Sequence, residues 1–322
     1  VEELVRPVSG PVEVRGPRTA VVSCPTPLDT ATPGSFTFYS RKSEGAAERI
    51  RNTAARVILC SAALNVPDAD YGDKTLIFVV NPRLAFIEIL QRYFTEPAAG
   101  AISPLAVVDE RAVIHPSVSI GPHSSIGNCS IGEGTVIHAH VYIDSHVTIG
   151  RNVTIQSGAT IGVKDAFAYE RNSRGELVKF PHFGGVVIED DVEIHAHANI
   201  DRGTFGNTVI GKGTKINRYA HIGHNGQIGR HCQIGGKVFI AGSSTVGDFC
   251  EIAFCTCVRN GTKIGRNCLV GMGSVVTEDV EADWVVYGAP ARKIRKNRIP
   301  PWCEEARSGN PENADGGTAT GA

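Results

Sequence analysis

Aliphatic residues recur at every sixth position, without a break, between Ile210 and Val276. The positions are Ile210, Ile216, Ile222, Ile228, Ile234, Ile240, Val246, Ile252, Val258, Ile264, Val270 and Val276. An α-helix repeats about every 3.6 residues and a half-buried strand about every two, so neither produces a sustained period of six. A fixed hexad is typical of a parallel β-helix, in which each hexad forms one short strand and one corner.

The position four residues after each aliphatic is nearly always small. It is occupied by Thr214, Ala220, Gly226, Cys232, Val238, Ser244, Cys250, Thr256, Thr262, Cys268 and Ser274. We therefore expect each strand to send one aliphatic and one small side chain into a narrow interior. Three hexads make one coil of about eighteen residues, and stacked coils cover each other's strand edges. Glycine often follows the aliphatic, as in Ile222-Gly223, where we expect the backbone to bend tightly.

The overall composition excludes several classes of protein. Lys and Arg number 32 against 33 Asp and Glu, so the charge balance does not indicate nucleic-acid binding. We recognise neither an apolar run of the roughly 20 residues that span a bilayer nor a signal peptide, and we expect a cytoplasmic protein. Cys232, Cys250 and Cys268 fall at the inward small position, and Cys60 lies in an apolar segment. We interpret these cysteines as core residues of a reducing compartment.

Residues 1–97 follow a different pattern from the hexads and predict a small α/β domain. Residues 1–20 have no clear period, and we expect a partly ordered lead-in. Strands are predicted at Ala20–Cys24, Ser35–Tyr39, Arg56–Cys60 and Thr75–Val80, and helices at Gly45–Ala54 and Pro82–Phe94. The second helix begins with a proline, and one face carries Leu84, Ile87, Leu90 and Tyr93, which we expect to be buried.

Hexads occupy residues 98–280 and are interrupted twice. After a short linker at Thr95–Gly100, the ladder runs to Ile161, and Val163–Gly185 then breaks the period with aromatic and charged residues. An excursion of that length from a regular scaffold is usually functional, so we expect it to form a wall of a site. A second, smaller bulge spans Thr204–Asn207. Residues 281–306 predict a cap with a basic helical segment, and residues 307–322 a disordered tail.

His224 is the strongest catalytic candidate among eleven histidines, because most of the others fall at outward or corner positions. Counting by coils, and allowing for the second bulge, His224 stacks over Arg202, while Gly242 follows in the same column and leaves open space. This arrangement is typical of a general base with a cation nearby. The alternative is a solvated corner histidine without chemistry. A zinc site is disfavoured, because the pairs His138/His140, His195/His197 and His221/His224 lack the spacing of the zinc-binding β-helix carbonic anhydrases.

The chain resembles a known family of enzymes in three stretches. The hexads are similar to those of the left-handed β-helix acyltransferases, and the handedness comes from this resemblance. More narrowly, the chain is similar to the UDP-3-O-acylglucosamine N-acyltransferases, which N-acylate a UDP-sugar from acyl carrier protein in lipid A synthesis. The stretches are Pro33–Phe38 with Asn81–Phe86; Asp165–Tyr169 with Arg174–Gly175 and Val178–Pro181; and Val192–Ile194 with Ile200–Gly203 and Ile222–Asn225.

The resemblance implies roles for particular residues. His224 matches the catalytic base, which takes a proton from the 2-amino group of the sugar as that nitrogen attacks the thioester carbonyl. Phe38 matches the aromatic that stacks on uracil, so residues 1–97 are expected to bind the uridine nucleotide. Together with the coil counting, we predict the substrate-binding residues Phe38, Phe167, Tyr169, Lys179, Arg202, Asn217, Asn225 and Gly242. We expect no resident cofactor or metal, since the cosubstrate is an acyl-carrier-protein phosphopantetheine thioester or acyl-CoA.

Four departures from the family leave the exact substrate open. Asn217 stands where the family keeps an acidic partner of the histidine, and Gly261 where it keeps a second histidine. Arg41–Glu44 replaces residues that help to hold the nucleotide, and Tyr287–Ile294 resembles the end of coenzyme-A-dependent sugar acetyltransferases. We therefore predict a homotrimeric N-acyltransferase acting on a UDP-3-O-acylglucosamine-like sugar. Two alternatives stay open: an acetyl- or acyl-CoA-dependent N- or O-acyltransferase on another nucleotide sugar, and a non-catalytic β-helix scaffold.

Overall fold

The computed structural model describes residues 1–40, 45–64, 66–67, 72–95, 100–163, 167–298 and 300. The chain divides into two compact units, Val1–Pro97 and Ala98–Ala322. Most of the predicted linker, Arg41–Glu44, Asp165, Ala166 and the predicted tail at 307–322 lie outside the described residues. Within the described residues, no helix is both long enough and apolar enough to cross a membrane.

The first unit is a five-stranded sheet with helices packed on it. Its strands run in the order β1-β5-β4-β3-β2, with bounds β1 Val12–Arg15, β2 Cys24–Pro25, β3 Ser35–Tyr39, β4 Val57–Ser61 and β5 Thr75–Val79. The helices are α1 (Ala46–Asn52) and α2 (Pro82–Tyr93), with a 3₁₀ turn at Leu28–Thr30. The sequence did not predict β1, which pairs antiparallel with β5 through its backbone, so the pairing requires no hydrophobic period.

The prediction for the buried face of α2 was wrong. Pro82, Ala85 and Ile89 are buried, whereas Leu84 and Ile87 are 46% and 40% exposed. Both faces of the helix carry apolar residues, so periodicity alone could not choose between them. The small Ala85 lies on the face that packs against the sheet. The Asn81 side chain caps the helix by accepting a hydrogen bond from the Leu84 N–H at 3.1 Å.

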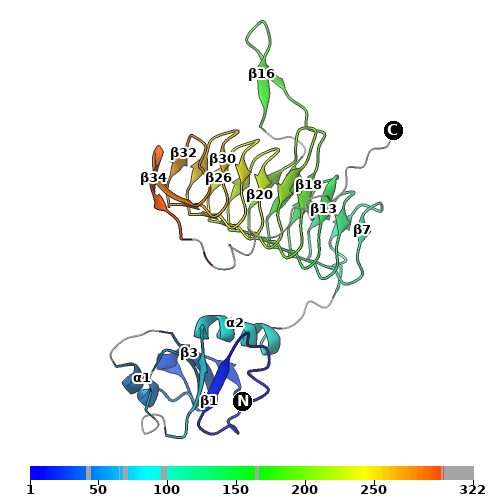
Figure 1. Ribbon diagram of the computed structural model, residues 1–322. Helices are drawn as coiled ribbons and strands as arrows, with labels where there is room; N and C mark the ends of the chain where they lie inside the picture. Colours follow the sequence, from blue (N-terminus) through cyan, green and yellow to red (C-terminus); the bar gives the residue numbers. More distant parts are fainter. Residues whose placement is uncertain are drawn as a thin grey trace, which may run out of the picture. The chain divides into compact units, whose positions relative to one another are not determined.

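The second unit is a left-handed parallel β-helix built from three sheets. Its coils stack side by side along the axis of the unit (Figure 1). Sheet I contains β7 Val113–Ile114, β10 Ser130–Ile131, β13 Val147–Ile149, β18 Val186–Ile188, β21 Thr208–Ile210, β24 Gln227–Ile228, β27 Thr245–Val246 and β30 Lys263–Ile264. Sheet II contains β8 Ser119–Ile120, β11 Val136–Ile137, β14 Thr154–Ile155, β19 Glu193–Ile194, β22 Lys215–Ile216, β25 Gln233–Ile234, β28 Glu251–Ile252, β31 Leu269–Val270, β33 Trp284–Gly288 and β34 Ala291–Lys296.

Sheet III completes the prism. It contains β6 Val107–Val108, β9 Ser125–Ile126, β12 Tyr142–Ile143, β15 Thr160–Val163, β20 Asn199–Asp201, β23 His221–Ile222, β26 Phe239–Ile240, β29 Cys257–Val258 and β32 Val275–Val276. A separate antiparallel hairpin, β16 (Tyr169–Arg171) with β17 (Leu177–Lys179), projects from the stack (Figure 1).

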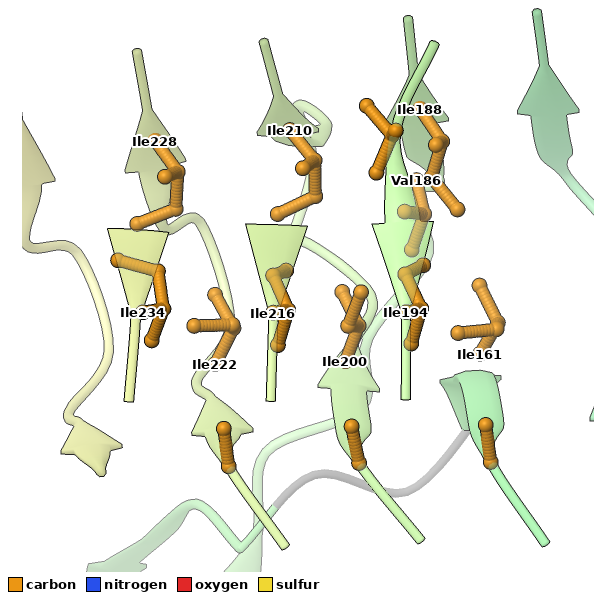
Figure 2. Packing of buried hydrophobic residues seen from close by; sticks show 14 of the residues in the cluster. Ile161, Val186, Ile188, Ile194, Ile200, Ile210, Ile216, Ile222, Ile228 and Ile234 are labelled. Carbon is orange, nitrogen blue, oxygen red and sulfur yellow. The ribbon is translucent and has the colours of Figure 1, made fainter. Parts of the chain in front are cut away.

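The hexad ladder forms the core, as predicted. Every aliphatic from Ile210 to Val276 is buried, and Ile200, Ile222 and Ile240 pair in register on neighbouring coils. Figure 2 shows part of this core, where Ile188, Ile210 and Ile228 form one row from coil to coil and Ile194, Ile216 and Ile234 form another. The prediction that the cysteines are small core residues is also confirmed, since Cys60, Cys232, Cys250 and Cys268 are buried. Burial raises the pKa of Cys60 to about 12, so its thiol stays protonated at neutral pH.

In the regular coils, the left-handed residue of each corner is not the hexad glycine. Gly223 does not adopt a left-handed conformation, whereas the corner residues Tyr219 and Asn225 do, at φ 60° and 56°. Glycine is needed at position 223 for a different reason. A Cβ there would lie 2.7 Å from the backbone N of Gly242, so a side chain would push the neighbouring coil away.

The predicted C-terminal helical segment is instead an antiparallel hairpin. β33 joins the edge of sheet II by pairing Leu269 with Val285, and β34 then pairs back on β33. Trp284–Gly288 is rich in β-branched and aromatic residues, which favour a strand. β34 covers the last paired edge with charged side chains, a common protection against further strand addition.

We expect Ile234→Ala to lower the free energy of unfolding by about 2–5 kcal/mol, because Ile234 is only 2% exposed and its truncation leaves a cavity between coils. The matched control is Gln233→Ala on the same strand, where the side chain is exposed and the expected change is within about 0.5 kcal/mol. Urea unfolding monitored by circular dichroism measures both. Equal destabilisation by the two variants would contradict this account of the core.

Candidate active site

Both interruptions of the hexad leave the stack at the same corner. The Val163–Gly185 excursion joins β15 of sheet III to β18 of sheet I, and the Thr204–Asn207 bulge joins β20 to β21. His224 follows β23 at this corner, before β24 begins. We call this edge of the prism the insertion corner. The regular coils therefore bring two irregular segments beside one histidine.

His224 faces a cleft of about 490 Å³. The cleft is lined by Phe167, Asp201, His221, Gly223, His224, Phe239, Ala241, Gly242 and Asn260. A Cβ on Gly242 would lie 2.4 Å from Nε2 of His224, so any side chain there would displace the imidazole. The structure thus brings together His224, Gly242 and Phe167 from the predicted set.

His182 is a second histidine at this site, and the sequence did not single it out. The excursion delivers its ring edge-to-face against His224, with ring centroids 5.1 Å apart and planes at 67°. The side chain is only 3% exposed, and Nδ1 lies 2.9 Å from the carbonyl oxygen of Phe180. A carbonyl only accepts, so Nδ1 carries the proton of the neutral ring. Nε2 is buried and has no hydrogen-bond partner among the described residues.

Asp201 and His221 form a further polar pair beside the cleft. Nε2 of His221 lies 3.4 Å from a carboxylate oxygen of Asp201, and the His221 ring stacks on Phe239 at 4.7 Å. The Asn199 amide donates to Asp201 at 2.7 Å and to Nδ1 of His221 at 3.0 Å. Nδ1 of His221 is therefore an acceptor, and the Nε2 proton faces the carboxylate. Asp201 stands next to Ile200 in the hexad, which is the signal that could have found it.

The surroundings of His224 favour its neutral form. Burial lowers the pKa of His224 below the ordinary value, and the neighbouring His182 ring lowers this pKa further. Asp201 acts in the opposite direction and raises it, while His221 lowers it. A neutral imidazole at physiological pH is the form that can accept a proton, which suits a general base.

Asn225 contacts His224, whereas the Arg202 guanidinium has other partners. The Asn225 amide nitrogen lies 3.1 Å from Nδ1 of His224. Ile200 pairs with Ile222, so Arg202 occupies the column predicted for it. Its guanidinium is buried, however, and donates to the carbonyl oxygens of Gly162 and Ser145 at 3.0 and 2.8 Å. With an ion pair to Asp144 at 3.4 Å, Arg202 fastens neighbouring coils together.

The predicted residues of the excursion lie along its base and hairpin. Phe167 is 91% exposed and contacts Tyr169 edge-to-face at 5.2 Å. Tyr169 pairs with Lys179 across the β16–β17 hairpin. These two side chains therefore belong to the hairpin and do not line the cleft. An aromatic contact links the end of this hairpin to the site, because the Phe180 ring packs edge-to-face on His182 with ring centroids 6.0 Å apart.

Asn217 lines a different cleft of the β-helix from His224, and Phe38 belongs to the first unit. Asn217 follows β22 in sheet II, where its side chain accepts a hydrogen bond from the Arg218 N–H at 2.7 Å. It lines a second cleft, of about 510 Å³, together with His195, Lys215, Gln233, Glu251, Phe254 and Met272. In the first unit, Phe38 is half-buried on Phe86, at 5.0 Å, and lines a shallow cleft with Leu28, Asp29, Tyr39, Ser40 and Arg49.

Known proteins share the repeats and the coil architecture of this chain. Residues 128–162 and 207–242 match the family model of the bacterial transferase hexapeptide (six repeats). A solved structure of UDP-N-acetylglucosamine acyltransferase from Francisella novicida is 31% identical, with a TM-score of 0.57 over 66% of this chain and 75% of that one. The corresponding enzyme from Moraxella catarrhalis is 26% identical, with a TM-score of 0.56 over 66% and 80%. The fold and repeats define a left-handed β-helix of the hexapeptide transferase class.

The curated relatives narrow this class. A UDP-3-O-acylglucosamine N-acyltransferase of Methylobacterium sp. (strain 4-46) is 37% identical over 49% of this chain, but the match spans only 46% of that relative's length. The relative of the same name from Delftia acidovorans is 36% identical over 85% of this chain and 82% of its own length. The chain belongs to the UDP-3-O-acylglucosamine N-acyltransferase family.

We expect the His224 imidazole to titrate with a midpoint below the ordinary histidine value of about 6.5, because burial and His182 both disfavour its charged form. His182→Phe keeps an aromatic ring at this position but removes the titratable imidazole, so the titration midpoint of His224 should move upward. His195→Phe, in the second cleft, is the matched control and should leave it unchanged. Proton NMR of the histidine Cε1–H signals measures all three. A wild-type midpoint at or above the ordinary value would contradict the assignment.

Proposed function

We propose that this protein is the N-acyltransferase of lipid A synthesis that moves an acyl group from acyl-carrier-protein thioester to the 2-amino group of a UDP-3-O-acylglucosamine-like sugar. Family membership and the neutral, partly buried His224 in an open cleft support this proposal. The single observation that carries it is that position 242, directly beside Nε2 of His224, is a glycine and places no side chain against the imidazole.

The chemistry requires one base and one leaving thiolate. As the sugar nitrogen attacks the thioester carbonyl, a C–N bond forms and Nε2 of His224 accepts a proton from that nitrogen. The C–S bond then breaks, and the imidazolium returns its proton to the departing thiolate. Holding amine and thioester side by side in one cleft supplies much of the rate enhancement of such a transfer. The residues of the cleft, Phe167 and Phe239 among them, are suited to exclude water from the acyl carbon.

The C-terminal hairpin offers a contact for an anionic donor. Arg292, Lys293, Arg295 and Lys296 stand on β34, and the ammonium groups of Lys293 and Lys296 lie 5.1 and 4.2 Å from the Trp284 ring centroid. An acidic carrier protein or the phosphates of coenzyme A would both be attracted to such a surface. Because Tyr287–Ile294 resembles the end of coenzyme-A-dependent sugar acetyltransferases, acetyl- or acyl-CoA-dependent acylation of another nucleotide sugar is our second candidate function.

We infer that the working form is a homotrimer. Large apolar side chains stand exposed on the prism, with Phe239 at 46%, Phe254 at 48% and Met272 at 60%. Neighbouring copies would cover such side chains, and closed cyclic symmetry is the common solution for a flat, repeated face. In such a trimer, a neighbouring copy would contribute the residues of its second cleft, Asn217 among them, to the active site. We further propose that the first unit binds a uridine nucleotide through Phe38.

The central assay mixes purified protein with UDP-3-O-acylglucosamine and 3-hydroxyacyl carrier protein. We expect the N-acylated product, and we expect His224→Ala to lower kcat/KM by about 10²–10⁴-fold, the usual contribution of a general base. His231→Ala, a corner histidine that stacks on Phe249, is the control and should retain activity. Light scattering of the same preparation should give three times the mass of one chain.

Three outcomes of this assay would contradict parts of the proposal. Turnover with acetyl-CoA but not with the carrier protein would favour the second candidate. Full activity in His224→Ala would contradict the role of His224 as the general base. No consumption of any thioester would support a non-catalytic scaffold.

Gly242→Ala should lower kcat/KM by at least about tenfold while the chain stays folded, because the added methyl occupies the place of Nε2. Gly206→Ala is the matched control, since a Cβ at Gly206 meets nothing within 4 Å. Circular dichroism checks the fold of each variant, and the acyl-transfer assay measures activity. Equal activity in the two variants would show that the open space beside the imidazole is not needed.

A further inference from the structure

The amide of Asn225 is fixed in orientation by its neighbour Thr204. The backbone N–H of Thr204 donates to Oδ1 of Asn225 at 2.7 Å, which identifies that atom as the oxygen. The amide nitrogen consequently points to the other side, where it donates to Oγ1 of Thr204 at 2.9 Å. The same nitrogen lies 3.1 Å from Nδ1 of His224. The Thr204 N–H, which the Thr204–Asn207 bulge positions, thus orients the Asn225 amide so that its nitrogen faces the His224 imidazole.

This contact determines where the proton of His224 resides. An amide nitrogen only donates, so Nδ1 of His224 must accept and holds its lone pair toward Asn225. A neutral imidazole has a single N–H, which therefore stands on Nε2. Nε2 is the atom beside Gly242, at the cleft. In this state, the His224 imidazole presents a hydrogen-bond donor, Nε2–H, to the cleft.

A base acting through Nε2 needs the opposite tautomer. Its lone pair must stand on Nε2 and its proton on Nδ1, where the Asn225 amide presents another proton. The titratable groups facing the ring come from three other elements: His182 from the excursion, Asp201 at the end of β20 and His221 of β23. Among the described residues, none of these makes a hydrogen bond to Nδ1, and Asn225 does.

We propose that Asn225 is a positioning residue that sets the tautomer of His224, holding the proton on Nε2 until the amide moves away from Nδ1. The kinetic consequence rests on the acyl transfer proposed above, whereas the tautomer itself does not. When a ligand in the cleft disturbs the Asn225–Thr204 pair, Nδ1 takes up a proton from solvent and Nε2 releases its proton to solvent, so the ring changes from a donor to a base. Acyl transfer is then coupled to filling of the cleft, and an unliganded enzyme carries a masked base.

Asn225→Asp tests the proposal with little change in shape. The carboxylate still accepts from the Thr204 N–H, and the Thr204 hydroxyl can rotate to donate to its second oxygen. That second oxygen now faces Nδ1 as an acceptor and favours the Nδ1–H tautomer. Asn225 has φ 56°, and Asp tolerates this left-handed conformation nearly as well as Asn does. The matched control is Asn207→Asp at the same corner, where Oδ1 accepts from the Gly185 N–H at 3.0 Å.

The direct experiment uses the full chain labelled with ¹⁵N-histidine, at a pH where His224 is neutral. Long-range ¹H–¹⁵N correlation reports which ring nitrogen carries the proton, and the His224 signals are those lost in His224→Gln. We expect Nε2–H in the wild type and in Asn207→Asp, and predominantly Nδ1–H in Asn225→Asp. Nδ1–H in the wild type, or an unchanged tautomer in Asn225→Asp, would overturn the proposal. The wild-type measurement does not depend on the Asn225 variant.

The acyl-transfer assay separates this inference from the proposed function. A carboxylate beside the imidazole favours its charged form, so the acidic limb of kcat/KM should move to higher pH by about one unit or more in Asn225→Asp. Asn207→Asp should move it less. If the tautomer reverses as expected but no variant transfers an acyl group, the proposed function fails and the role of Asn225 stands. If His224→Ala abolishes transfer while Asn225→Asp leaves tautomer and pH profile unchanged, the function stands and the role of Asn225 fails.

Discussion

In-register stacking of coils is the constraint on which the β-helix depends. Each inward aliphatic lies on the aliphatic of the next coil, as Ile200, Ile222 and Ile240 do, and the backbones bond directly between coils. Glycines such as Gly223 keep adjoining backbones close, because a Cβ there would meet the next coil. Repeats of this kind bury almost nothing alone, so the stack gains stability only as neighbours are added.

The candidate site arises where this regularity stops. The excursion and the small bulge both leave at the insertion corner, and each contributes one group to His224. The excursion brings His182 against the ring, and the bulge brings Thr204, which orients Asn225. A rigid column supplies the third element, Gly242 on the next coil. Placing irregular segments on a rigid scaffold is a common way to hold reacting groups precisely.

The sequence predicted the features that repeat. The period of six specified the β-helix, the buried aliphatic ladder and the core cysteines, and coil counting placed His224, Arg202 and Gly242 in one column. Structural features that occur only once in the chain could not be predicted from the repeat. His182 reaches His224 through a segment without a period, and the buried face of α2 was chosen by the fit of Ala85 to the sheet rather than by apolar spacing. The C-terminal hairpin was missed because its basic residues were interpreted as a helix, whereas pairing with β31 determined its form.

The central claim is that His224 accepts the proton of the acceptor amine in the cleft of the insertion corner. A crystal structure of the protein with UDP-3-O-acylglucosamine bound tests this most directly. The account predicts the 2-amino nitrogen within about 3 Å of Nε2 of His224, beside Gly242, since a general base must reach the proton it removes. An amine bound away from every copy of His224, with Gly242 uncovered, would contradict it.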